Sequence, residues 1–433
     1  YSWLYAKKMG GVFRLRIEDT DLARSTEASA EGIVAGLAWL GLDFSGPLVY
    51  QSQRFPRYKE VLDTWLTEGK AYRCYCSQDR LNALREHQVA HQEKPRYDGH
   101  CRDRTDGDVR APHVVRFRFP QDGETVVDDG VHGRVVFQNQ EFDDLILART
   151  DGTPTYNFTV IVDDWEMAVS HVIRGDDHLN NTPKQLQMLL ALGAKPPQYA
   201  HIPMILGQDG KRLSKRHGAV HVLQYRDQGV LPEALLNYLV RLGWSHGDQE
   251  IFSREEMIEF FDFEHLQRSP AAFDVEKLRW LNQHYLKTVP VSRLVPLLEE
   301  QYTRLGIAVS ADVSLEQVVI ALRERCQTLS EMAEKSRFCF EEPVFNPAAV
   351  AQHLTDTART LLTELRAQLA TVLWEAEAIH NCLKAFVTER GLKLPQIAQP
   401  LRVALTGDTS SPSIDQTLVM IGQARVLARL ANI

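Results

Sequence analysis

The stretch Gln208–Gly218 reads QDGKRLSKRHG and guides the interpretation of the whole sequence. Its basic side chains are Lys211, Arg212, Lys215, Arg216 and His217. A glycine-flanked basic loop can lay cations and backbone N–H groups along a polyphosphate. The loop follows the apolar run His201–Leu206, as a loop at the carboxyl end of a sheet strand would. We therefore predict that it stabilises the charge that develops when pyrophosphate leaves. The alternative is a solvated basic turn.

A second polar stretch, Arg16–Asp21 (RIEDTD), overlaps the end of Gly11–Glu18, which we predict to be a strand. Ligands of open α/β sheets bind at the carboxyl ends of strands. A carboxylate at such a place, here Glu18, can hold a substrate ammonium group by a charge-assisted hydrogen bond. The alternative is an acidic turn in which Asp21 and Thr26 cap the next helix.

Two further stretches carry candidate ligand-binding groups. They are Pro154–Phe158 (PTYNF) and His171–Pro183 (HVIRGDDHLNNTP). Arg174 ends the predicted strand Val172–Arg174, and its planar guanidinium suits bidentate capture of a carboxylate. The alternative is an ion pair of Arg174 with one of the two aspartates that follow it. The β-rich run Thr155–Val162 predicts another strand, with Tyr156 in the core or at the rim of a site.

RLSKR at 212–216 resembles the second signature of class I aminoacyl-tRNA synthetases, in the form typical of glutamyl-tRNA synthetases. The other three stretches occur in the order expected of that family. The resemblance implies ATP-dependent attachment of L-glutamate to the 3′ end of tRNA(Glu) through glutamyl-adenylate, with Mg²⁺ accompanying ATP. It assigns transition-state stabilisation to Lys215, and glutamate binding to Glu18, Tyr156 and Arg174. The implied ATP-binding loop consists of Arg212, Leu213, Ser214, Lys215 and Arg216.

Three of the six cysteines, Cys74, Cys76 and Cys101, are clustered in the sequence. Two thiolates two residues apart, with a third across a short excursion, predict a zinc knuckle. Some members of the resembled family bind Zn²⁺ here with three cysteines and a histidine. This sequence has Asp103 at the fourth position, which would make a harder site. His100 is an alternative fourth ligand, and three free thiols without metal are the alternative to zinc binding.

We expect an α/β N-terminal half, with a Rossmann-like parallel sheet and an inserted small β-rich domain, followed by an all-α C-terminal half. Apolar residues recur with helical spacing in the second half. These periodic segments are Leu231–Leu242, Val275–Leu286, Leu294–Leu305, Leu315–Glu334, Ala348–Leu373 and Ser413–Leu430. The predicted parts are a catalytic domain (1–73 and 154–218), an inserted acceptor-binding domain (74–153), a helical stem-contact domain (219–295) and a helical anticodon-binding region (296–433).

Bulk composition limits the possible classes. The 433 residues suggest two to four domains, and 44% hydrophobic and 24% charged residues are ordinary for a globular protein. A net charge of −8 argues mildly against non-specific nucleic-acid binding but leaves room for a basic face. No apolar run approaches the length of a membrane span. Cysteine usage suggests a reducing compartment, so we expect a cytoplasmic protein. We also expect the protein to be a monomer.

The family's first signature, a Gly-rich HIGH-type stretch, is absent from the sequence. The segment Ser2–Gly11 reads as the end of a helix. We expect the missing signature to lie upstream in a longer chain. One alternative is a non-discriminating enzyme that also charges tRNA(Gln), and another, from a different class, is a non-catalytic tRNA-binding remnant.

Overall fold

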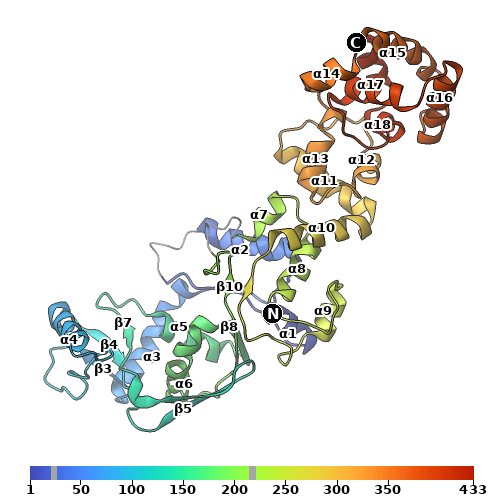
Figure 1. The fold of residues 1–433 in the computed structure, drawn as a ribbon. Helices are drawn as coiled ribbons and strands as arrows, with labels where there is room; N and C mark the ends of the chain where they lie inside the picture. The colour runs from blue at the N-terminus through green and yellow to red at the C-terminus, as the bar shows by residue number, and fades with distance from the viewer. Residues whose placement is uncertain (21–26, 214–220) are drawn as a thin grey trace. The chain divides into compact units, whose positions relative to one another are not determined.

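The computed structural model describes residues 1–20, 27–213 and 221–433 of the chain. Figure 1 traces its elements. The residues form two compact units: the first is Tyr1–His217 with Leu239–Phe273, and the second is Gly218–Tyr238 with Asp274–Ile433. The first unit mixes helices and strands, while the second is almost entirely helical. The predicted fold class, α/β followed by all-α, is confirmed.

The first unit contains short and medium-length helices. They are α1 (Ser2–Lys8), α2 (Glu27–Leu40), η1 (Gln51–Arg54), α3 (Phe55–Thr67), α4 (Gln78–Ala90), η2 (Asn139–Glu141), α5 (Tyr156–Glu166), η3 (Asp176–Asn181), α6 (Thr182–Ala191) and α9 (Arg254–Phe260). Helix α8 (Pro232–Arg241) begins in the second unit and ends in the first.

The strands of the first unit are mostly short. They are β1 (Arg16–Ile17), β2 (Val49–Tyr50), β3 (Ala71–Cys74), β4 (Val114–Phe117), β5 (Glu124–Asp129), β6 (Gly133–Gln138), β7 (Ile146–Ala148), β8 (His171–Gly175), β9 (Gln198–Ile202), β10 (Ile205–Leu206) and β11 (Ala271–Ala272). The predicted strand Gly11–Glu18 is therefore only two residues long. The predicted strand Val172–Arg174 lies within β8, which extends one residue further at each end.

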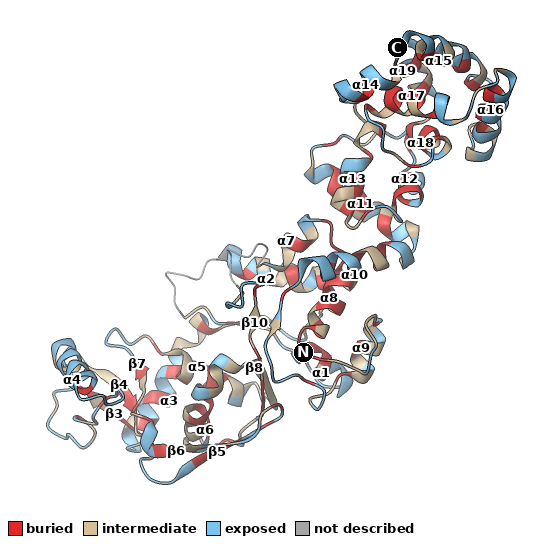
Figure 2. Ribbon diagram, in the orientation of Figure 1, coloured by how far each residue is buried: buried red, intermediate tan, exposed pale blue. Residues whose placement is uncertain are grey.

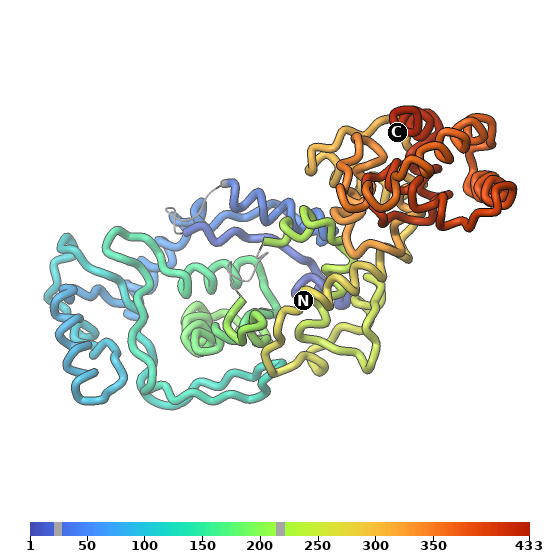
Figure 3. Tube along the Cα trace, turned by 45° about the horizontal axis from the view of Figure 1, so that its top comes forward, coloured from blue at the N-terminus to red at the C-terminus, as the bar shows by residue number. Residues whose placement is uncertain are grey.

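The sheets are mixed. A four-stranded sheet has the order β6-β5-β9-β8, and an antiparallel three-stranded sheet has the order β3-β4-β7. Within the larger sheet, β8 and β5 both run parallel to β9, whereas β5 and β6 form an antiparallel hairpin. This hairpin is visible as paired teal strands in Figure 3. Two parallel pairs, β1-β2 and β10-β11, complete the sheets.

The predicted strand Thr155–Val162 is wrong, because these residues form helix α5. The β-branched run Thr159–Val162 has strand propensity, but every residue of it is buried. A helix that is apolar on all sides is stable when the core surrounds it, and such packing overrides propensity. Phe158 and Val160–Val162 belong to one core cluster. As a consequence Asp163 and Asp164 lie within a helix rather than in a turn.

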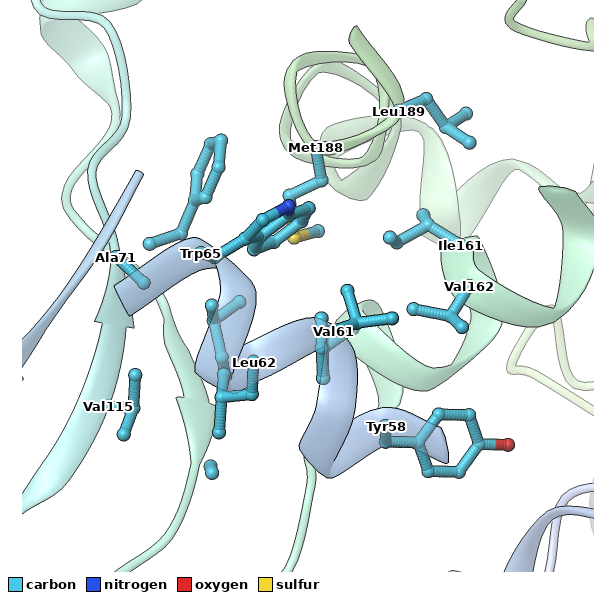
Figure 4. Packing of buried hydrophobic residues seen from close by; sticks show 14 of the residues in the cluster. Tyr58, Val61, Leu62, Trp65, Ala71, Val115, Ile161, Val162, Met188 and Leu189 are labelled. Carbon is cyan, nitrogen blue, oxygen red and sulfur yellow. The ribbon is translucent and has the colours of Figure 1, made fainter. Parts of the chain in front are cut away.

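That core cluster joins α3, α5 and α6 to the three-stranded sheet. Figure 4 shows Trp65 and Val61 of α3 beside Ile161 and Val162 of α5, with Met188 of α6 close by. Trp65 is only 2% exposed, and its ring lies 5.4 Å from that of Phe117 on β4. Burial of this kind fixes the position of α5 relative to the strands beside it.

The second unit is built from amphipathic helices. They are α7 (Val222–Asp227), α10 (Val275–Thr288), α11 (Val291–Arg304), α12 (Leu315–Leu322), α13 (Leu329–Lys335), η5 (Arg337–Cys339), α14 (Pro347–His353), α15 (Asp356–Leu369), α16 (Ala376–Glu389), α17 (Pro395–Thr406), α18 (Ile414–Ile421) and α19 (Gln423–Ala431). Buried and exposed residues alternate along them in Figure 2. The predicted helix Leu315–Glu334 is two helices, because Thr328 accepts from Glu331 N–H and starts α13.

Local chemistry sets where these helices begin and end. The Asp274 carboxylate accepts hydrogen bonds from the N–H groups of Glu276 and Lys277 at 2.9 and 3.1 Å, and so starts α10. Gly407 ends α17 with φ 83°, and a Cβ there would lie 2.2 Å from the Val344 carbonyl oxygen. Within the described residues, none of the helices has the length and apolar character needed to span a bilayer.

Leu189 and Leu190 are adjacent on α6 and test the core directly. Leu189 is 1% exposed and Leu190 is 56% exposed. We expect Leu189→Ala to lower the free energy of unfolding by about 2–5 kcal/mol, because it leaves a cavity in the cluster. Leu190→Ala should change it by less than about 0.5 kcal/mol. Urea unfolding of both variants, followed by tryptophan fluorescence, measures the difference. Equal effects would contradict the assigned packing of α6.

Candidate active site

The structure brings Glu18, Tyr156 and Arg174 together. Glu18 follows β1, Tyr156 begins α5, and Arg174 lies near the end of β8. Burial raises the pKa of Tyr156, the negative charge of Glu18 adds to the rise, and the Arg174 guanidinium opposes it. The Tyr156 hydroxyl is therefore under the electrostatic influence of both the Glu18 carboxylate and the Arg174 guanidinium. This is an arrangement in which one small molecule carrying both charges can be held.

Arg174 is held by polar side chains of the neighbouring strand and helix. Its Nε donates to Nε2 of His201 at 3.2 Å, and its Nη2 donates to Oγ1 of Thr182 at 2.7 Å. Its guanidinium carbon lies 5.4 Å from the ring centroid of Tyr199. The alternative raised from the sequence, an ion pair with Asp176 or Asp177, does not occur among the described residues. Arg174 is therefore not neutralised by the acidic turn that follows it.

The acidic side of the site is organised by Arg16. Its Nη1 donates to Asp164 at 2.9 Å, and its Nη2 lies 3.4 Å from Glu18. Burial raises the pKa of Asp164, while the charge of Arg16 opposes the rise. The Glu18 side chain is 42% exposed, whereas that of Asp164 is 13% exposed. Glu18 is thus the more accessible carboxylate for an incoming ammonium group.

Asp19, next to Glu18, has a structural role. Its carboxylate accepts from the backbone N–H of Ser52 at 2.8 Å and from the Ser52 hydroxyl at 2.5 Å. Ser52 lies in η1, so Asp19 fixes this short helix beside β1. Within the acidic turn, Asp19 therefore has a structural role, whereas the Glu18 carboxylate remains accessible. Asp21 and Thr26 lie outside the described residues.

The described part of the basic loop is a tight turn after β10. Leu213 N–H donates to the Ile205 carbonyl at 3.0 Å, and Gly207 N–H donates to that of Lys211 at 2.7 Å. The Arg212 side chain is 71% exposed and lies 3.5 Å from the Asp177 carboxylate. The predicted loop residues Ser214, Lys215 and Arg216 lie outside the described residues. Arg212 thus joins the turn to η3, which follows Arg174.

The three predicted thiol ligands form one group in space. The sulfur atoms of Cys74, Cys76 and Cys101 all lie within 4.8 Å of one another. Burial opposes ionisation of Cys74, but hydrogen bonding to the Tyr97 hydroxyl and to backbone N–H lowers its pKa overall. Burial, together with hydrogen bonding to Cys101, raises the pKa of Cys76 to about 12. Three soft donors at this spacing match the preferences of Zn²⁺.

Asp103, the predicted fourth ligand, is not part of this group. Its carboxylate lies 2.7 Å from Nη1 of Arg118, and its side chain is 86% exposed. An ion pair with Arg118 competes with metal ligation for the same oxygen. His100 is also exposed, and its N–H donates to Asp98 at 3.3 Å. Neither side chain belongs to the thiol group among the described residues.

Tyr97 is the polar side chain that the sequence analysis missed at this place. Its hydroxyl oxygen lies 3.4 Å from the sulfur of Cys74 and 3.9 Å from that of Cys76, and it accepts from Cys101 N–H at 2.8 Å. The ring is 8% exposed and is covered by Arg116 at 3.8 Å. The only signal in the sequence is its position four residues before Cys101. A lone tyrosine near cysteines is rarely a ligand, so this signal was too weak to use.

Asp129, Thr182 and His201 were also missed near Arg174. All three side chains are buried, and each makes a hydrogen bond within the group that surrounds the guanidinium. His201 begins the apolar run that precedes the basic loop, but the sequence offers no sign of which strands pair. Their proximity depends on the order β5-β9-β8, which joins segments about 70 residues apart in the chain.

Comparison with known proteins identifies the family of the chain. Residues 1–280 match the family described as "tRNA synthetases class I (E and Q), catalytic domain", and residues 256–433 match "Anticodon binding domain". The chain is 54% identical over 432 residues to glutamate–tRNA ligase 2 of Coxiella burnetii (strain Dugway 5J108-111), covering 99% of this chain and 92% of the relative. Glutamate–tRNA ligase 1 of C. burnetii (strain RSA 331 / Henzerling II) matches equally well.

Two solved structures resemble the whole chain. One is a glutamate tRNA ligase from Elizabethkingia meningosepticum CCUG26117 in complex with its amino acid, with a TM-score of 0.84 and 29% identity. The other is glutamate-tRNA synthetase from Elizabethkingia anophelis, with a TM-score of 0.82 and 29% identity. Each match covers 100% of this chain and 94% of the solved one. The chain therefore belongs to the class I aminoacyl-tRNA synthetases of the glutamate and glutamine type, and within them to the glutamate–tRNA ligase family.

Proposed function

We propose that this chain attaches L-glutamate to the 3′ end of tRNA(Glu) in an ATP-dependent reaction, with Glu18, Tyr156 and Arg174 as the amino-acid site. The proposal rests on an accessible carboxylate, Glu18, that Arg16 joins to the helix beginning with Tyr156, and on a guanidinium, Arg174, held by His201 and Thr182. Both charges act on the Tyr156 hydroxyl, Glu18 raising its pKa and Arg174 lowering it. Free glutamate carries an ammonium group and two carboxylates. Glu18 binds the ammonium group, and Arg174 binds the side-chain carboxylate.

Arg174 also accounts for selection against glutamine. A guanidinium gains a charge-assisted, bidentate hydrogen bond from a carboxylate but only a neutral contact from an amide. Because the described aspartates nearby do not pair with Arg174, bound glutamine would leave its charge without a counter-ion. Sites that leave a buried polar group unpaired reject the wrong substrate strongly. Tyr156 forms the wall between the two charged ends.

The proposed reaction has two steps. In the first, a glutamate α-carboxylate oxygen attacks the α-phosphorus of ATP, the bond from that phosphorus to the bridging oxygen breaks, and pyrophosphate leaves. In the second, a ribose hydroxyl of the terminal tRNA adenosine attacks the acyl carbon, and AMP leaves with the bonding electron pair. No protein nucleophile is required. Alignment and charge stabilisation provide the rate enhancement.

ATP and Mg²⁺ accompany class I synthetase chemistry, and the basic loop 212–216 is proposed to meet the phosphates. Arg212 and Leu213 begin this loop after the turn 207–211, which follows β10 and brings Leu213 back to Ile205. Lys215 is proposed to stabilise the pyrophosphate charge as it develops. A bound Mg²⁺ would neutralise phosphate charge and orient the phosphate oxygens.

We also propose a structural zinc site formed by Cys74, Cys76, Cys101 and Tyr97. The proximity of the Tyr97 hydroxyl to two of the sulfurs supports it as the fourth donor in place of Asp103. Zinc would link β3, which carries Cys74, to the loop that carries Tyr97 and Cys101. Such a site stabilises a small segment that has little core of its own.

The four-part division remains a proposal: the catalytic part at 1–73 and 154–218, the acceptor-binding insert at 74–153, the stem-contact part at 219–295 and the anticodon-binding region at 296–433. The all-helical second unit and the family match over 256–433 support the last of these. A cytoplasmic location and a monomeric state stay predictions from the sequence. All six cysteines are free, which suits a reducing compartment.

Arg174→Ala should weaken glutamate use specifically. A hydrogen bond to a charged group contributes about 1.5–3 kcal/mol, so KM for glutamate should rise roughly 10- to 100-fold while KM for ATP changes less than about threefold. ATP–pyrophosphate exchange with tRNA(Glu) present measures both constants. Arg85→Ala, an exposed arginine of α4, is the control and should leave both unchanged. Equal loss of glutamate and ATP use in Arg174→Ala would refute the assignment.

Lys215→Ala should slow adenylate formation while tRNA binding stays close to that of the parent. Loss of one preorganised charge partner in a transition state lowers kcat by roughly 100- to 1,000-fold. Lys211→Ala, which removes a neighbouring lysine of the same basic stretch, should lower kcat only a few-fold. The reason is that the position of Lys215, rather than the net charge of the loop, is proposed to stabilise the pyrophosphate. Single-turnover adenylate formation and filter binding of tRNA give the two readouts. A collapse of tRNA binding in Lys215→Ala would make the loop an RNA contact instead.

The zinc proposal predicts different effects for the two candidate fourth ligands. Tyr97→Phe should weaken zinc binding by about tenfold or more, since loss of a ligand or its close support costs that much. Asp103→Asn should keep the parent's zinc content and affinity. Metal content by mass spectrometry and competition with a chromogenic chelator measure both. Loss of zinc in Asp103→Asn, with Tyr97→Phe unaffected, would restore Asp103 as the ligand.

A further inference from the structure

We propose that Asp129 and His201 are positioning residues that set the direction of the Arg174 guanidinium, and so determine glutamate affinity without contacting glutamate. The inference rests on the proposed function, in which Arg174 binds the substrate carboxylate. Asp129 and His201 are buried and lie on two strands other than that of Arg174. The hydrogen of the His201 ring is assigned to one of its two nitrogens. The evidence is a continuous set of hydrogen bonds from β5 through β9 to β8.

The three residues lie in a row across adjacent strands. In the sheet order β6-β5-β9-β8, Asp129 ends β5, His201 lies on β9 and Arg174 lies on β8. His201 and Arg174 are direct partners in the parallel register of β9 and β8. The side chains of Asp129 and His201 are both fully buried. Water therefore cannot substitute for any contact between them.

Asp129 fixes the proton on Nδ1 of His201. Its Oδ2 lies 2.6 Å from that nitrogen, and its Oδ1 accepts from the N–H groups of Val131 and His132 at 2.9 Å each. Burial opposes ionisation of Asp129, but the hydrogen bonds from His201 and from these backbone groups lower its pKa overall. An ionised carboxylate only accepts hydrogen bonds. Nδ1 of His201 must therefore donate.

The other ring nitrogen must then accept. Nε2 of His201 lies 3.2 Å from Nε of Arg174, and an arginine Nε always carries a hydrogen. Were Nε2 protonated, two donors would face each other in a dry interior and two cations would be adjacent. His201 is thus neutral, with its hydrogen on Nδ1 and its lone pair directed at Arg174. The carboxylate sets the tautomer, as second partners of histidine commonly do.

Thr182 completes the grip on the guanidinium. Its Oγ1 accepts from Nη2 of Arg174 at 2.7 Å and lies 3.0 Å from Nε2 of His201. The contacts to His201 and Thr182 use one edge of the guanidinium, formed by Nε and Nη2. They therefore fix the direction of the other edge, formed by Nη1 and Nη2. A carboxylate bound there meets a fork that has already lost its rotational freedom.

Tyr199 restricts the same group from the side. Its ring stacks on that of His201 with centroids 5.9 Å apart and an interplanar angle of 8°. The guanidinium carbon of Arg174 lies over the Tyr199 ring at 5.4 Å. Two flat groups packed against a buried ring have few alternative rotamers. Arg174 is thereby held in its plane as well as along one edge.

Asp129→Asn tests the proposal with little change of shape. The amide oxygen should stay on Val131 and His132, so the new NH₂ group faces the histidine ring. His201 would then shift its proton to Nε2 and point a donor at Arg174. We expect KM for glutamate to rise about tenfold or more, with KM for ATP within about twofold of the parent. ATP–pyrophosphate exchange with tRNA(Glu) provides both values.

Asp144→Asn is the matched control. Asp144 is also a buried carboxylate, which accepts from the Tyr72 hydroxyl at 2.6 Å and from Phe119 N–H at 2.9 Å. It should lower thermal stability without raising KM for glutamate. If both aspartate variants raise the KM values for glutamate and ATP alike, Asp129 is merely structural and the proposal is overturned.

A double-mutant cycle separates positioning from general damage. In an Arg174→Ala background, Asp129→Asn should raise KM for glutamate less than about twofold further, because its effect passes through the missing guanidinium. Full additivity would overturn the proposal. If Arg174→Ala raises KM for glutamate and Asp129→Asn does not, the positioning role alone fails. If Arg174→Ala itself has no selective effect on glutamate, the proposed amino-acid site fails.

Thr182 supplies a second pair of variants should Asp129→Asn not fold. Thr182→Val removes the hydroxyl at nearly constant volume, whereas Thr182→Ser keeps it. We expect Thr182→Val to raise KM for glutamate about three- to tenfold and Thr182→Ser to retain the parent's value. An equal KM for glutamate in the two variants would contradict a role for this hydroxyl in directing Arg174, and with it the proposed grip.

Discussion

The buried carboxylate of Asp163 is the interaction on which the site depends. It lies on α5 with no exposed surface, and it accepts from Gln51 at 2.8 Å, Tyr58 at 2.8 Å and Arg54 at 2.7 Å. Arg16 Nε is 3.7 Å away. A buried charge is tolerated only when hydrogen-bond donors surround it. The elements that supply these donors, α3, η1 and β1, must therefore keep their positions relative to α5. The same α5 begins with Tyr156, and Arg16 precedes Glu18 by two residues. The segments that carry the proposed ligand-binding residues Glu18 and Tyr156 are therefore joined to the scaffold by this one set of interactions.

The positions of two residues of the candidate site, Glu18 and Arg174, could be predicted because each follows an apolar run. Glu18 and Arg174 come at or near strand ends, and the structure keeps them there although β1 is much shorter than the sequence suggests. The α/β-to-helical division was also evident, since the spacing of apolar residues changes along the chain. Helix α5 could not be predicted in this way. Its β-branched residues favour a strand locally, and only the surrounding core makes a helix the better solution.

Other features depend on contacts across long stretches of sequence. Tyr97 is placed by the loop between α4 and β4, and nothing local indicates that its hydroxyl lies beside the sulfurs of Cys74 and Cys76. Asp129 and His201 are 72 residues apart, and their contact follows from the pairing of β5 with β9. Pairing of distant strands is a global property, because many alternative orders satisfy the same local pattern. In both cases the sequence indicates the candidate binding residues, the cysteines and Arg174, but not the distant side chains that the fold brings beside them.

The pairing of β5 with β9 links two parts of the first unit mechanically. Strand β5 belongs to the 74–153 segment, yet its last residue, Asp129, is the one that pairs with Tyr199 and bonds to His201. The β5–β6 hairpin thus carries a buried carboxylate, that of Asp129, at the end of β5 that pairs with β9. A movement of the hairpin that shifts β5 relative to β9 would also displace the Asp129 carboxylate. Strand β5 and the neighbourhood of Arg174 are therefore coupled through this contact.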